Sequence, residues 1–155
     1  MHWPANKPHF LGIIAVLFLI FGSSKLTEPR GIRNNNPGNI RGNNDRWLGA
    51  FGIDNAGFVQ FSDPVYGLRA MARIIGNYQR IHYLVTITQI IHRWAPTSEN
   101  DTQSYIDSVA SRSGIDANAF IEPDDLPALM AAMIYHENGK QPYAMTLIEE
   151  GISLA

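Results

Sequence analysis

The pattern of hydrophobic and polar positions divides the chain into an apolar segment, a loop-rich stretch and a helical half. Residues 10–22 form an uncharged run of 13 residues without a polar face. From Lys25 to Tyr66 the chain is rich in Asn, Gly, Arg and aromatic residues and shows no helical period until late. We expect loops there, with two short strands over 47–53 and 57–61 joined by a turn.

After this stretch, apolar positions recur at the spacing of helices. Ser62 or Asp63 caps a helix that has Pro64 in its first turn, and the helix carries an apolar stripe of Val65, Leu68, Met71, Ile75 and Tyr78. Further helices are expected over 86–94, 101–113, 124–136 and 143–151. The expected fold class is therefore mainly α with a small β-hairpin wing, in one domain.

Composition excludes several kinds of chemistry. The chain has 155 residues and no Cys, so it has no disulfide, thiolate zinc site, iron–sulfur cluster or cysteine nucleophile. Its five His show no metal-ligand spacing, and no phosphate loop or Ser-His-Asp arrangement stands out. The sequence therefore implies no metal and no cofactor.

Charge is distributed unevenly although the net charge is only −2. Residues 25–93 carry nine basic and four acidic side chains, whereas residues 94–155 carry two basic and ten acidic ones. Two interpretations remain open. Either the two halves attract one another, or the basic half meets an anionic polymer such as cell-wall glycan or nucleic acid.

The N-terminal apolar run is typical of export or membrane anchoring, so residues 1–25 are assigned to targeting and 26–155 to the folded domain. The run is shorter than the roughly 20 residues of a membrane span, which favours a signal peptide cleaved near Gly22 or Ser24. Extended over 10–26 it reaches 17 residues, the lower limit for an uncleaved anchor. The domain is then exported, or anchored outside the cytoplasm in the bacterial inner membrane or an internal virion membrane.

The helix expected over 124–136 leads to a carboxylate on its apolar face. Leu126, Met130, Met133 and Glu137 follow one another in steps of four, three and four, just before Asn138 and Gly139 end the helix. Poor solvation and the negative end of the helix dipole both favour the protonated form of such a group, as a general acid requires. Alternatively, the side chain turns to water or pairs with a basic residue of the other half.

Four segments resemble motifs of peptidoglycan-cleaving enzymes. Residues 30–42 read Arg-Gly-Ile-Arg-Asn-Asn-Asn-Pro-Gly-Asn-Ile-Arg-Gly, followed by Trp47 and Gly49, and resemble a loop that follows the catalytic helix of autolysin-type glucosaminidases. Residues 57–61 resemble the Gly-Leu-Met-Gln strand of lytic transglycosylases. Residues 94–109, with Trp-Ala-Pro, Asn-Asp-Thr and Tyr-Ile-x-x-Val, resemble the late motif of the same enzymes.

The fourth segment, residues 134–139, resembles the end of the catalytic helix in these families, but it comes last instead of first. Reading the chain as a circle from Glu137 through Ala155 into Arg30 restores the family order. The chain thus resembles a lysozyme-like fold in circularly permuted order, as in a group of small phage and prophage proteins. The resemblance covers residues 30–152, and Asn138 stands where the family has Ser.

The resemblance implies cleavage of the β-1,4 bond between N-acetylmuramic acid and N-acetylglucosamine, with Glu137 as general acid and base. It nominates Gln60 and Tyr105 as sugar-binding groups, with Tyr105 touching either Glu137 or the substrate. Asn36 and Asn39 either bind acetamido groups or form turns. Trp47 and Trp94 are interpreted as core or cleft-wall aromatics.

Hydrolysis normally needs a second carboxylate, for which Asp54, Asp63 and Asp101 are the candidates. Asp54 also fits a turn, and Asp63 and Asp101 fit helix caps. We therefore favour a single-acid lytic transglycosylase, with a two-carboxylate lysozyme or glucosaminidase as the alternative. Glu28 is a rival acid because it precedes the Asn-rich loop, but no helix or apolar stripe surrounds it.

The expected partners are peptidoglycan glycan strands, a membrane contacted through residues 10–22, and other virion proteins. Another hypothesis is a membrane-anchored virion structural protein that grips glycan without cutting it. Nucleic-acid binding by residues 30–46 is disfavoured because the downstream half is acidic and the N-terminal run predicts export.

Overall fold

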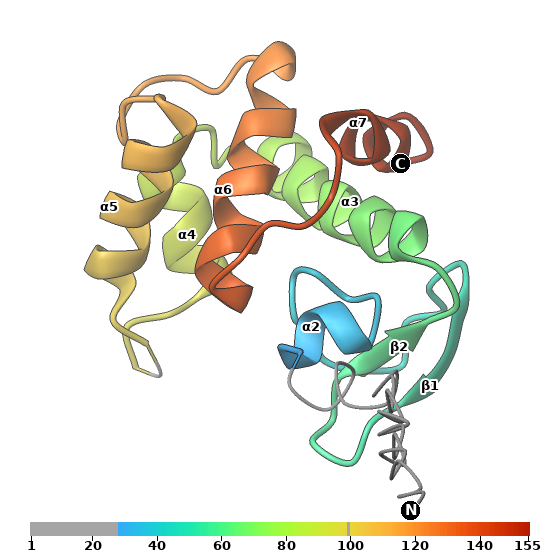
Figure 1. Ribbon diagram of the computed structural model, residues 1–155. Helices are drawn as coiled ribbons and strands as arrows, with labels where there is room; N and C mark the ends of the chain where they lie inside the picture. Colours follow the sequence, from blue (N-terminus) through green and yellow to red (C-terminus); the bar gives the residue numbers. More distant parts are fainter. Residues whose placement is uncertain (1–27, 99) are drawn as a thin grey trace, which may run out of the picture.

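The computed structural model describes residues 28–98 and 100–155. The apolar run 10–22 and the domain boundary at residues 25 and 26 lie outside the described residues. Within the described part of the chain, no helix combines the length and the apolar character needed to cross a membrane. The predicted fold class is confirmed at the coarse level, because the domain is mainly helical with one two-stranded sheet (Figure 1).

The loop-rich stretch contains a short helix and a hairpin. Helix α2 spans Arg30–Arg33, and strands β1 (Ala50–Ile53) and β2 (Val59–Phe61) pair antiparallel with an irregularity between Ala50 and Gly52. The predicted hairpin is confirmed, with shorter strands than expected. No helix was expected before residue 62. This expectation is wrong for α2, because its four residues are too few to show a hydrophobic period.

The predicted helices are all present in the described chain, with ends that differ by a few residues. They are α3 (Pro64–His82), α4 (Ile87–Trp94), α5 (Thr102–Ser113), α6 (Leu126–Asn138) and α7 (Met145–Ser153). A 3-10 turn, η1 (Pro123–Asp125), precedes α6, so the α-helix begins two residues later than expected and also ends two residues later.

Local capping explains where these helices begin. The Asp63 side chain accepts a hydrogen bond from the Val65 amide at 2.9 Å at the start of α3. Thr86 and Gln89 form a capping box at α4. Asp101 accepts from the Ser104 amide at 3.1 Å at α5. The sequence-based assignment of Asp63 and Asp101 as caps is therefore confirmed.

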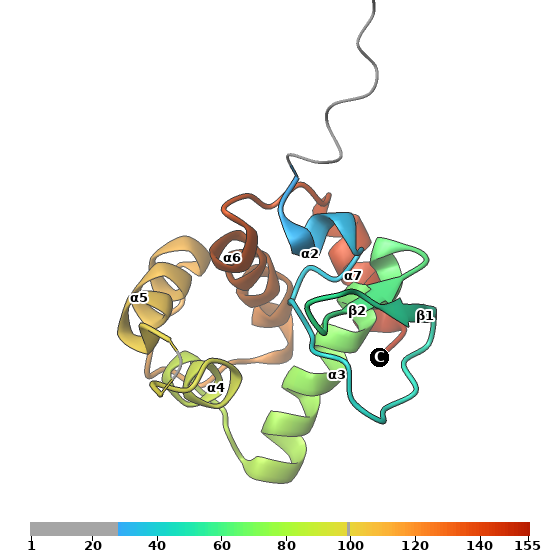
Figure 2. The same cartoon turned by 90° about the horizontal axis from the view of Figure 1, so that it is seen from below.

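Helix α3 runs through the middle of the domain. Helices α4 and α5 lie on one side of it and α2 with the hairpin on the other, as the two views agree (Figures 1 and 2). The main core is formed by buried side chains of α3 to α7 and a smaller one by Ile40, Val59, Phe61 and Ala70. Trp94 packs against both cores, so the end of α4 lies where the helical part meets the wing.

Candidate active site

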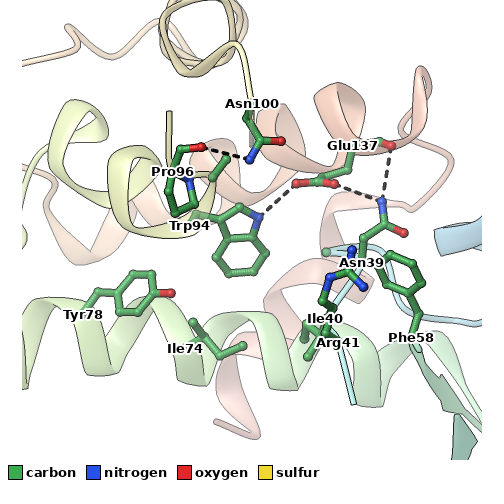
Figure 3. A pocket seen from close by; sticks show the side chains of 12 residues that line it. Asn39, Ile40, Arg41, Phe58, Ile74, Tyr78, Trp94, Pro96, Asn100 and Glu137 are labelled. Carbon is green, nitrogen blue, oxygen red and sulfur yellow. Dashed lines mark hydrogen bonds between the residues drawn. The ribbon is translucent and has the colours of Figure 1, made fainter. Parts of the chain in front are cut away.

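Glu137 lies half-buried in the last turn of α6 and lines a cavity of about 430 Å³ at this junction (Figure 3). The wall is made by a loop of the wing, by α3 and by the end of α4. The other lining residues are Gly38, Asn39, Ile40, Arg41, Phe58, Ile74, Tyr78, Trp94, Ala95, Pro96 and Asn100.

Three neutral donors hold the carboxylate of Glu137. The indole Nε1 of Trp94 lies 3.0 Å from Oε1, and the Tyr105 hydroxyl lies 2.8 Å from the same oxygen. The Nδ2 of Asn39 lies 2.9 Å from Oε2. Among the described residues no Lys, Arg or His lies within ion-pair distance of Glu137. The side chain thus points inward, as the stripe predicts, rather than to water or to a basic residue.

Tyr105 is buried at 3% exposure, and the hydrogen bond to Glu137 satisfies its hydroxyl. Burial raises the pKa of Tyr105 well above its usual value, and the charge of Glu137 raises it further. The Tyr105 ring stacks on His136 with centroids 3.8 Å apart. Burial lowers the pKa of His136 from 6.5, which outweighs the opposing effect of Glu137. Because its pKa is raised, the Tyr105 hydroxyl stays protonated and donates its hydrogen bond at neutral pH.

Trp94 is held by close packing against the Asn-rich loop. A Cβ atom at Gly38 would lie 2.9 Å from Cζ2 of Trp94, closer than a side chain can approach without a shift. Only a glycine at position 38 lets the loop backbone rest on the indole ring. The interpretation of Trp94 as a cleft-wall residue agrees with this position, and its hydrogen bond to Glu137 is an addition that the sequence did not indicate.

Two consecutive asparagines tie the loop to the hairpin. Nδ2 of Asn34 donates to Oδ2 of Asp54 at 2.8 Å, and Nδ2 of Asn35 donates to the carbonyl of Phe61 at 3.0 Å. Asn35 has a φ of 51°, in the left-handed region that Asn tolerates better than most residues. These side chains position the loop and do not line the Glu137 cavity.

Asn36, a candidate sugar ligand, is fully buried, and both the nitrogen and the oxygen of its side-chain amide form hydrogen bonds within the protein. Its Nδ2 donates to the carbonyls of Ile40 and Val59 at 2.9 Å each, and its Oδ1 accepts from the Ile40 amide at 2.8 Å. This arrangement matches the turn-forming alternative. Asn39 differs because it faces the cavity and Glu137.

Asn39 and Asn138 join the loop to the end of α6. Asn39 adopts a φ of 48°, and its side chain donates to Glu137. The Nδ2 of Asn138 donates to the carbonyls of Pro37 at 2.8 Å and Ile134 at 3.0 Å. Asn138, which stands where the enzymes of the resemblance have Ser, therefore fastens the helix end to the loop.

Gln60 and Glu28 lie in a different hollow of about 500 Å³, which Tyr143 also lines. Glu28 pairs with Nζ of Lys140 at 3.0 Å. Burial, with a smaller effect of the Glu28 charge, raises the pKa of Tyr143 to about 12. The structure therefore does not bring Gln60 or Glu28 together with Glu137.

The candidate second carboxylates do not line the Glu137 cavity. Oδ1 of Asp54 accepts from the amides of Ala56 at 2.9 Å and Phe58 at 3.0 Å, as expected of a turn former. These bonds, led by the one from Phe58, lower the pKa of Asp54. With Asp63 and Asp101 acting as caps, Glu137 is the one carboxylate among the described lining residues.

Arg41 and Phe58 are cavity residues that the sequence did not nominate. They face one another in an isolated antiparallel bridge, outside the two named strands. The first predicted strand begins at residue 47, so nothing local indicated that Arg41 pairs with Phe58. Among the described residues, no three His, Asp or Glu side chains are grouped closely enough to hold a metal ion.

No protein-family model matches the chain. A phage protein is similar to it over almost its whole length: Protein P5 of Pseudoalteromonas phage PM2 is 41% identical over 152 residues, which cover 94% of this chain and 95% of the phage protein.

Proposed function

The chain belongs to the same family as Protein P5 of phage PM2, and we propose that it is a phage-type peptidoglycan-cleaving enzyme with Glu137 as its single general acid and base. The bond cleaved is the β-1,4 link between N-acetylmuramic acid and N-acetylglucosamine. The observation that carries the proposal is the Glu137 carboxylate, held in a cavity by three uncharged donors from three separate segments. The name of the phage relative states no activity, so the proposal depends on this site.

The three donors indicate which oxygen of Glu137 delivers the proton. A carbonyl oxygen has two lone pairs, and at Oε1 both are used by Trp94 and Tyr105. With the indole N–H and the Tyr105 hydroxyl both donating to it, Oε1 is the carbonyl oxygen of the protonated acid. The acidic hydrogen then belongs to Oε2, on the side of Asn39. The leaving oxygen of the substrate is expected to approach there (Figure 3).

Glycosidic cleavage follows from this geometry in two proton transfers. Oε2 gives its proton to the glycosidic oxygen as the bond between this oxygen and the anomeric carbon breaks. A hydroxyl of the same sugar then attacks the anomeric carbon and returns its proton to Glu137, which leaves an anhydro-ended sugar. This route needs one carboxylate, in agreement with the described lining of the cavity.

A lysozyme-like fold in circularly permuted order is part of the same proposal. The end of α6 meets the Asn-rich loop through Asn39 and the α5 helix through Tyr105. These are the segments whose order is restored when the chain is read from Glu137 through Ala155 into Arg30. The contacts support the permutation because they bring together three of the four motifs on which the resemblance was based.

The proposed place of action is the cell wall, outside the cytoplasm. Residues 1–25 export the domain or anchor it in a virion or bacterial membrane, which gives it access to peptidoglycan. The phage origin of the relative supports a role during wall penetration or host lysis. The two roles need the same chemistry.

The test is mass spectrometry of muropeptides released from purified sacculi by the full-length protein. Glu137→Gln keeps the shape of the side chain and removes the acid, so release should fall at least about 100-fold. Glu149→Gln, at an exposed position of α7, is the matched control and should act like the wild type.

The products decide the reaction type. Anhydro-ended sugars support the lytic transglycosylase. Reducing ends contradict the single-acid route and return attention to Asp54, Asp63 and Asp101. If the folded protein releases nothing, or if Glu137→Gln remains fully active, the assignment of Glu137 is wrong.

The second candidate is a non-catalytic virion protein that binds glycan. The single carboxylate among the described cavity residues and the replacement of the family's Ser by Asn138 favour it. It predicts that the protein sediments with sacculi and generates no new glycan ends.

A further inference from the structure

We propose that Arg41 binds a carboxylate of the substrate and so makes an anionic glycan the preferred substrate of the Glu137 cavity. The inference rests on the proposed function and adds the substrate class to it. Its basis is the geometry and charge of one rim of the cavity, formed by Arg41 and Phe58.

The backbone fixes Arg41 in the wall of the cavity that Glu137 also lines. Arg41 forms an isolated bridge with Phe58, and the amide of the next residue, Gly42, donates to the carbonyl of Gly57 at 2.8 Å. The guanidinium carbon of Arg41 lies 4.7 Å from the centroid of the Phe58 ring. Figure 3 shows Arg41, Phe58 and Asn39 on the same side of the cavity. The cation is therefore held in place before any ligand arrives.

The charge of Arg41 is not neutralised by the described part of the chain. No carboxylate among the described residues lies within ion-pair distance of it. Arg30 provides the contrast, because its guanidinium carbon lies 4.8 Å from the same ring but its Nε is 3.6 Å from Asp54. Arg41 is the only Lys or Arg among the described residues that line the cavity.

An exposed guanidinium fixed at the rim of a glycan-sized cavity is suited to a carboxylate. Guanidinium and carboxylate can form two parallel charge-assisted hydrogen bonds. Peptidoglycan carries carboxylates on the peptides attached to its glycan strands, whereas chitin-type glycans carry none. Since Oε2 of Glu137 faces the same side, a strand held by Arg41 would present its glycosidic oxygen to the acid.

The experiment compares native sacculi with sacculi whose carboxylates have been converted to neutral amides with carbodiimide and ethanolamine. For the full-length wild type, the rate of muropeptide release should be about 5- to 10-fold lower on the amidated sacculi. Arg41→Gln should show this lower rate on both substrates. Arg30→Gln is the matched control, and it should keep the preference of the wild type.

A binding measurement separates this inference from the proposed function. Glu137→Gln protein, alone and combined with Arg41→Gln, is sedimented with both kinds of sacculi. Binding that is weakened by amidation only while Arg41 is present supports the inference, even if the wild type releases no products. Equal binding and equal cleavage of the two substrates would overturn the inference and leave the role of Glu137 intact.

A second variant, at the same position, distinguishes loss of carboxylate binding from loss of folding. Arg41→Lys keeps the charge and loses the paired hydrogen bonds, so its preference for native sacculi should be intermediate. If Arg41→Gln and Arg41→Lys are both folded by circular dichroism and both keep the full preference of the wild type, Arg41 does not bind the carboxylate.

Discussion

The amide of Asn39 lies 2.9 Å from the carboxylate of Glu137, although the two residues are 98 positions apart in the chain. One side chain comes from a loop of the wing and the other from the last turn of α6. The contact therefore exists only when the wing packs against the helical part. It links formation of the candidate active site to completion of the fold.

The donors to Oε1 of Glu137 are expected to act as positioning residues. Tyr105→Phe and Trp94→Phe each remove one hydrogen bond to Oε1 of Glu137, so each should lower kcat about 10-fold while KM changes little. Steady-state kinetics on sacculi fragments, with circular dichroism to check folding, measures this. An unchanged kcat in both variants would contradict the role of these donors.

Two substitutions separate the contribution of the Asn39 side chain to activity from the effect of its left-handed backbone on stability. Asn39→Gly and Asn39→Ala both remove the donor to Oε2, so both should lower activity by a similar factor. Only the Ala variant places a Cβ at a φ of 48°, which should cost about 1 kcal/mol more in the free energy of unfolding. Urea denaturation and activity of the two variants provide the comparison. Similar stability would argue against backbone strain at this position.

Gly31, on the short helix α2, lies against the loop that carries Asn39. A Cβ there would collide first with Oδ1 of Asn138 at the end of α6, and it would lie 2.8 Å from the carbonyl oxygen of Asn36 and 2.9 Å from Oδ1 of Asn39. Gly31→Ala should therefore displace Asn138 and Asn39, lower activity, and destabilise the fold by about 1–3 kcal/mol. Thermal unfolding and sacculus digestion test both effects.

The control for Gly31→Ala is Gly114→Ala, at the end of α5. That position has a φ of 74° and no other atom within 4 Å of an added Cβ, so the substitution strains only the local backbone. It should destabilise the protein by about 1 kcal/mol and leave activity unchanged. Equal activity of the two variants would show that the contact of Gly31 with the loop is not required.

Protonation of His136 is expected to destabilise the fold in mild acid. Burial lowers the pKa of His136 in the folded protein, with Arg112 adding to this and Glu137 and Asp101 opposing it. The unfolded chain therefore binds more protons below about pH 6.5, and the free energy of unfolding should fall as the pH falls through this range. Urea denaturation at several pH values should show a smaller dependence in His136→Gln. A dependence unaltered by the substitution would contradict this assignment.

Much of the helical part could be predicted because its signals are local. Asp63, Thr86 and Asp101 accept hydrogen bonds from amides two or three residues ahead, and their side chains favour these positions in any context. The steps of four, three and four that end at Glu137 likewise follow from helix geometry. The face of α6 that carries Glu137 was therefore available from the sequence, which left open whether the side chain turns inward or to water.

The surroundings of Glu137 were decided by tertiary structure. Its donors Asn39, Trp94 and Tyr105 come from 98, 43 and 32 positions away, and no local pattern relates them to the end of α6. The resemblance nominated Gln60 as a sugar-binding residue, but the structure has it in another hollow with Glu28 and Tyr143.

The sequence by itself determined helices α3 to α7, their caps and the helix face that carries Glu137, because capping and hydrophobic periodicity act over a few residues. Only the tertiary structure decided which hydrogen-bond donors and which cation share a cavity with that carboxylate. Arg41 is the clearest case, since its place follows from a bridge to Phe58, 17 positions further along the chain. Packing of the wing against α3 and α6 brings these groups together, and such packing depends on the whole chain at once.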